Sequence, residues 1–148
     1  MTHMTTCFLF KRHHPPGEII SLEHILECLT ESASQSEWQL VELDGIGNTR
    51  LLGVDIGDLM EEVNKPGSRK ILNWSQLTTL AKCLEDILDI TVFSADHRDI
   101  PANPWIRPSP FRVFISLNDA SWWHVEFRSK LEADAFHSSM IRKCPWLA

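Results

Sequence analysis

Residues 111–128 read FRVFISLNDASWWHVEFR, and this stretch decides the fold. Apolar residues at every second position mark its first part, from Phe111 to Leu117, and its second part, from Trp122 onward. A period of two is typical of β-strands that cover a core with one face. The four residues between the two parts, Asn-Asp-Ala-Ser, are turn formers. The stretch predicts an antiparallel β-hairpin, with Trp123 in the core and Trp122 on the other face.

Two helices are predicted by capping residues. Ser129 with Glu132, and Asn73 with Gln76, have the spacing of capping boxes. The first pair predicts a helix directly after the hairpin. Behind the second pair, apolar residues recur at helical spacing and predict a helix over residues 74–88.

Shorter patterns predict the elements nearer the N-terminus. The expected strands are residues 7–10, 38–43, 50–54 and 90–93, and two more helices are expected to begin at Ser21 and Asp55. Residues 44–48 are expected to be a turn, and residues 94–110, with four prolines, a long irregular connection. This order predicts an α+β fold: a mostly antiparallel sheet with helices packed on it, ending in a β-hairpin followed by a helix. The length predicts a single domain of residues 1–148.

Charge is segregated along the chain. Residues 18–62 hold eleven acidic residues and one basic residue, whereas the whole chain has a net charge of −6. A negative surface repels nucleic acid, attracts basic partners and speeds its encounter with them. Two interpretations stay open: a solvated surface that keeps the protein soluble, or a surface that binds a basic protein.

The candidate partner-binding residues are helical carboxylates and two tryptophans. Glu23, Glu27 and Glu31 are four residues apart and are expected to form one row on a helix, where like charges repel by about 0.2–0.5 kcal/mol per pair. Trp105 in the proline-rich connection and Trp122 on its strand are candidate interface anchors, unless a helix covers them. The full set is Glu23, Glu27, Glu31, Asp55, Asp58, Glu61, Glu62, Trp105 and Trp122.

Motifs for catalysis or metal binding do not occur in the sequence. The four cysteines, at positions 7, 28, 83 and 144, fit neither a small disulfide framework nor a Cys-x-x-Cys site. We expect Cys28, Cys83 and Cys144, which fall on predicted helices, to pack in the core, and we expect no metal, cofactor or catalytic residue. The sequence has no apolar stretch of membrane-spanning length and no secretory signal, so a cytoplasmic location without membrane contact is expected.

The size, the α+β pattern and the acidic stretch of residues 18–62 resemble those of small immunity proteins, which protect bacteria from the toxin domains of neighbouring cells. The resemblance implies a non-enzymatic protein that binds and neutralises a basic toxin domain, for example a nuclease. Two alternatives stay open. One is a small intracellular enzyme that uses a His or Cys near residues 94–110, and the other is an acidic adaptor or DNA mimic.

Overall fold

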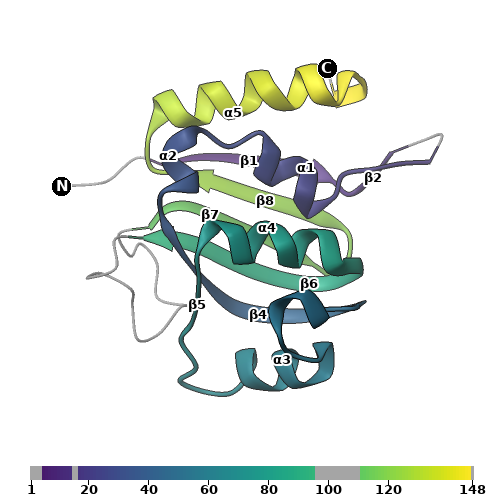
Figure 1. Cartoon of the computed structure of the whole chain (residues 1–148). Coiled ribbons are helices and arrows are strands. Elements are labelled where there is room, and N and C mark those ends of the chain that lie inside the picture. The colour runs from purple at the N-terminus through teal and green to yellow at the C-terminus, as the bar shows by residue number, and fades with distance from the viewer. Residues whose placement is uncertain (1–4, 15–16, 96–110, 148) are drawn as a thin grey trace.

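The structure is a computed structural model that describes residues 5–14, 17–95 and 111–147. Its centre is a six-stranded sheet in which every neighbouring pair is antiparallel, in the order β1-β8-β7-β6-β4-β5 (Figure 1). The strands in that order are β1 (Thr6–Lys11), β8 (Trp122–Phe127), β7 (Phe111–Asn118), β6 (Leu84–Ala95), β4 (Glu37–Gly47) and β5 (Lys70–Leu72). A separate two-stranded ribbon pairs β2 (His13–His14) with β3 (Glu18–Ile19).

Helices line one face of this sheet (Figure 1). They are α1 (Leu22–Glu27), α2 (Glu31–Ser34), α3 (Ile56–Val63), α4 (Trp74–Cys83) and α5 (Lys130–Lys143), with short 3-10 turns η1 (Arg50–Leu52) and η3 (Pro145–Leu147). The predicted α+β fold is confirmed, and so is the C-terminal hairpin, which is β7 and β8 followed by α5.

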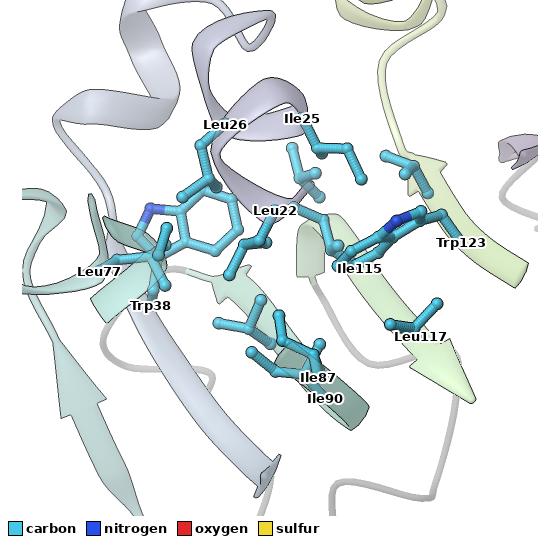
Figure 2. Packing of buried hydrophobic residues seen from close by; sticks show 14 of the residues in the cluster. Leu22, Ile25, Leu26, Trp38, Leu77, Ile87, Ile90, Ile115, Leu117 and Trp123 are labelled. Carbon is cyan, nitrogen blue, oxygen red and sulfur yellow. The ribbon is translucent and has the colours of Figure 1, made fainter. Parts of the chain in front are cut away.

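The core lies between the helices and the sheet, and two tryptophans anchor it (Figure 2). Trp38 of β4 and Trp123 of β8 are fully buried, with α1 residues such as Leu22 between them. Each indole N–H still has an acceptor, because Trp38 Nε1 donates to the Ala33 carbonyl at 3.0 Å and Trp123 Nε1 donates to the Ile20 carbonyl at 2.9 Å. The prediction that Trp123 is a core residue is confirmed.

The predicted helix over residues 74–88 is too long. The Asn73–Gln76 capping box is present in both directions, but α4 ends at Cys83 and β6 begins at Leu84. β4 also continues to Gly47, through the expected turn at residues 44–48, and pairs there with Leu84. Pairing with β4 therefore overrides the helical periodicity of residues 84–88.

Close approach of backbones explains a glycine in this part of β4. A Cβ atom built on Gly47 would lie 2.2 Å from the Cys83 carbonyl oxygen, which is shorter than any real contact. The tight join between α4 and β6 thus requires glycine at this position.

Two smaller predictions are also wrong. Residues 50–54 do not form a strand but include η1, which ends at Gly53 with φ of 75°, in the left-handed region. The helix that begins at Ser21 does not reach Glu31: α1 ends at Glu27, and α2 begins at Glu31 after an extended Thr30. Strand β5 has no counterpart in the prediction.

Candidate protein-binding surface

A cavity of about 400 Å³ opens between α1, α2 and α4. Its apolar lining comes from Leu26, Leu29, Trp74 and Ala81. Its charged and polar lining comes from Glu23, Glu27, Glu31, Thr30, Ser34, Thr78 and Lys82. We call it the acidic groove, because three carboxylates and one ammonium group line it over an apolar floor.

Two of the helices that form the groove, α1 and α4, are fixed at their N-termini by capping boxes. The Ser21 side chain accepts a hydrogen bond from the His24 backbone N–H at 3.1 Å, and the His24 ring accepts one from the Ser21 N–H at 3.1 Å. The capping box of α4, formed by Asn73 and Gln76, fixes the start of that helix, where Trp74 is the first residue. Trp74 also packs against the buried Trp38, with ring centroids 6.0 Å apart. The floor of the groove is therefore part of the core packing.

Helix α2, which carries Glu31, is held by a polar network to β7 and α5. Arg112 Nη2 donates to Glu132 Oε1 at 2.5 Å and to Ser32 Oγ at 2.9 Å. Ser32 Oγ in turn donates to Glu132 Oε1 at 3.1 Å, and Arg112 Nη1 donates to Ser36 Oγ at 3.2 Å. Glu132 was expected to complete a capping box with Ser129, but its side chain serves this network instead. The network fixes the short helix that forms the outer wall of the groove.

The three carboxylates of the groove differ in their partners. Glu27 forms an ion pair with Lys143 of α5, and the hydrogen bond from this pair raises the pKa of Lys143. Glu23 and Glu31 have no ion pair within the described part of the chain. Glu23 is half-buried and Glu31 is exposed, so these two carboxylates are available at the rim. Sequence spacing predicted the three glutamates but not Lys143, which comes from the far end of the chain.

The other predicted acidic residues lie beyond α4, around α3 (Figure 1). Asp55 is the N-cap of α3 and accepts from the Gly57 N–H at 3.0 Å. Glu62 pairs with Lys70 at 3.3 Å. Asp58 and Glu61 are exposed and have no ion pair among the described residues. The acidic residues predicted to bind a partner therefore lie in two separate regions of the surface.

The second region contains a shallow groove of about 550 Å³ between β4 and α3. Glu42, Asp44 and Asp89 line it, together with Glu61 and Lys65. Partial burial raises the pKa of Glu42, and the nearby Asp89 and Asp44 raise it further, against a hydrogen bond from Thr91 that lowers it. Asp44 and Asp89 stand directly opposite each other on β4 and β6. Like charges in that position repel each other, so this groove is electrostatically strained.

The two candidate tryptophans are not part of either groove. Trp122 lies on the sheet face opposite the fully buried Trp123, is 45% exposed, and carries the Lys11 ammonium 5.6 Å from its ring centroid. Since the helices cover the other face, Trp122 and the acidic groove lie on opposite sides of the sheet. Trp105 lies outside the described residues, as does most of the expected connection at 94–110.

Two of the three cysteines predicted to lie in the core are packed there, whereas Cys83 is only partly buried. Cys28 is 4% exposed and Cys144 is 2% exposed, and burial raises the pKa of both thiols. A raised pKa keeps a cysteine as the less nucleophilic thiol. Among the described residues, no group of three or more His, Cys, Asp or Glu side chains could hold a metal ion. Within the same residues, no helix is long and apolar enough to cross a membrane.

Comparison of the chain with protein-family models, with curated proteins and with solved structures found no match.

Proposed function

We propose that this chain is a non-enzymatic binding protein that holds a basic protein partner on the acidic groove. The observation that carries the proposal is the combination of an apolar floor with carboxylates at the rim. Protein interfaces commonly have such a composition, an apolar centre that excludes water and a polar rim. A solvated surface needs the charge but not the apolar floor.

The charges around the groove favour a cationic partner. Lys143 neutralises Glu27, whereas Glu23 and Glu31 have no ion pair among the described residues and are open to a cationic partner. The net charge of −6 adds a long-range field that draws basic proteins toward the molecule. Long-range attraction sets the rate of encounter, whereas contacts in the groove set the lifetime of the complex.

The resemblance to small immunity proteins supplies the kind of partner. On that basis the partner is a basic toxin domain, and binding blocks its active site in a one-to-one complex. The function is then the affinity itself, and no catalytic group is required of this chain.

The proposal predicts that a toxin domain is encoded directly upstream of the gene for this protein, and the test uses that domain. We expect co-expression to protect cells from that domain, and we expect the purified proteins to form a one-to-one complex by calorimetry. The association rate should fall as salt rises, because exposed charges are screened beyond about 8–10 Å near physiological ionic strength. An upstream gene without a toxin domain, or a purified domain that does not bind, would contradict the proposal.

Charge-reversal variants then test whether the partner binds at the acidic groove. Glu23→Lys with Glu31→Lys removes the two groove carboxylates that have no ion pair within the described ranges, and we expect binding to weaken at least tenfold. Asp58→Lys with Glu61→Lys is the control, since it makes the same change of charge at exposed residues of the region around α3. Glu27 is unsuitable, because a lysine there would stand beside Lys143 and disturb the fold.

A further inference from the structure

From the groove geometry we infer that its specific ligand is an arginine side chain with an apolar neighbour, inserted between Trp74 and the carboxylates of Glu23 and Glu31. The inference deepens the proposed function and rests on it for the identity of the partner. It names the chemistry that the groove recognises, which charge alone leaves open.

The size of the groove favours inserted side chains. A volume of about 400 Å³ is at the lower end of the roughly 300–1,000 Å³ of small-ligand sites. Such a volume suits one or two side chains and does not suit a whole docked helix. The apolar floor at Leu26, Leu29 and Ala81 can cover the methylene groups of a long side chain and an apolar residue next to it.

The floor also presents an aromatic ring. Trp74 is half-buried and is held by its contact with Trp38, so its indole is a rigid surface at the groove. A guanidinium group stacks on an indole, where the attraction of the cation to the ring adds about 0.5–1 kcal/mol at exposed sites. Lysine lacks the flat group that allows this stacking.

The charges in the groove orient the cation. Lys82 of α4 lies on one side, and Glu23 and Glu31 come from α1 and α2. Repulsion from Lys82 and attraction to the two glutamates direct a guanidinium toward the α1 and α2 side. Its N–H donors form a planar fork that matches the two oxygens of a carboxylate, whereas a lysine ammonium binds a carboxylate with less directional preference.

Short peptides test the inference without the natural partner. The probes are a five-residue peptide with a central arginine flanked by leucines, and two matched peptides with lysine or neutral citrulline at the centre. Binding is followed by NMR through the indole N–H signal of Trp74, which the spectrum of Trp74→Phe assigns. We expect the arginine peptide to shift this signal saturably, the lysine peptide to bind at least threefold more weakly, and the citrulline peptide at least tenfold more weakly.

Matched variants test the position of the ligand. Glu23→Gln with Glu31→Gln should weaken the arginine peptide about tenfold, whereas Asp58→Asn with Glu61→Asn makes the same change of charge around α3 and should weaken it less than twofold. Equal binding of the citrulline peptide, equal effects of the two double variants, or an unmoved Trp74 signal at millimolar peptide would each overturn the inference.

The same variants separate this inference from the proposed function. If the toxin domain binds the Glu23→Gln, Glu31→Gln protein with unchanged affinity, the arginine site is wrong and the binding function stands. If the arginine peptide binds in the groove while no toxin domain does, the site stands and the immunity function is wrong.

Discussion

Replacement of Trp123 by alanine should destabilise the protein far more than the same change at the adjacent Trp122. The two residues follow one another on β8 and face opposite sides of the sheet. Trp123 is fully buried and donates a hydrogen bond to the Ile20 carbonyl at 2.9 Å. Trp122 is 45% exposed and has Lys11 over its ring.

The magnitudes follow from these environments. Truncation of a buried aromatic to alanine costs about 3–5 kcal/mol, from lost burial and from the cavity that remains. The Ile20 carbonyl also loses its donor, which adds about 1 kcal/mol or more. Trp122→Ala loses partial burial of about 1–1.5 kcal/mol and a contact with Lys11 of about 0.5–1 kcal/mol, so its total cost is about 2 kcal/mol.

Urea unfolding followed by far-ultraviolet circular dichroism measures both variants without relying on tryptophan fluorescence. Because a domain has only about 5–15 kcal/mol of stability, Trp123→Phe serves as a milder variant if Trp123→Ala does not fold. It keeps a buried ring but loses the hydrogen bond to Ile20, and it should still cost more than Trp122→Phe. Equal losses of stability at the two positions would refute the reasoning, since they would require both faces of β8 to be packed alike.

Three further predictions concern the join between β4, α4 and β6. Asp86 accepts a hydrogen bond from Arg12 at 2.5 Å, and this bond and the arginine charge lower the pKa of Asp86. The ionised Asp86 therefore stabilises the fold above its unfolded pKa of about 3.9. Asp86→Asn should therefore be less stable than the parent at pH 7, and the difference should vanish in urea titrations as pH falls through the lowered folded pKa. The pKa of Glu42 is raised in the folded protein, so the charged carboxylate destabilises the fold at pH 7. Glu42→Gln should therefore raise the urea midpoint of unfolding at pH 7, and this gain should shrink as the pH falls toward the unfolded pKa of about 4.3. A gain independent of pH would contradict this cause. Gly47→Ala should lower the melting temperature, because its Cβ would lie 2.2 Å from the Cys83 carbonyl oxygen. Gly67→Asn, at an exposed site with φ of 78°, is the control and should be tolerated. An equal fall in melting temperature for the two variants would show that the backbone at Gly47 relaxes freely.

The parts of the fold that the sequence predicts are those with local causes. The hairpin at 111–128 follows from alternation and turn residues, and the start of α4 follows from its capping box. The end of α4 has a distant cause, since residues 84–88 pair with a strand about forty positions earlier in the chain. Periodicity within residues 74–88 carries no information about that partner. The same reason applies to β5, a three-residue strand that is defined only by its pairing with β4.

The same distinction between local and distant causes applies to the candidate site. The spacing of Glu23, Glu27 and Glu31 predicts one row on one helix, yet the chain breaks between Glu27 and Glu31 and still brings all three to one groove. Packing of α2, held by Arg112 from β7, produces that result. The groove floor at Trp74 comes from α4, so no pattern local to residues 18–62 could have indicated it.

The number of acidic residues in the sequence overstates how many carboxylates are available to bind a partner. Within residues 18–62, Asp55 caps a helix, and Glu27 and Glu62 are paired with lysines from other elements. These carboxylates contribute to the long-range field, but their short-range hydrogen-bonding capacity is partly taken by the fold. Glu23 and Glu31 differ because they lie beside apolar surface that a partner can cover, and covering that surface also strengthens their attraction to a cation by excluding water. The position of a carboxylate relative to apolar surface, more than the number of carboxylates, is therefore the reason that we propose the acidic groove as the site for a basic partner.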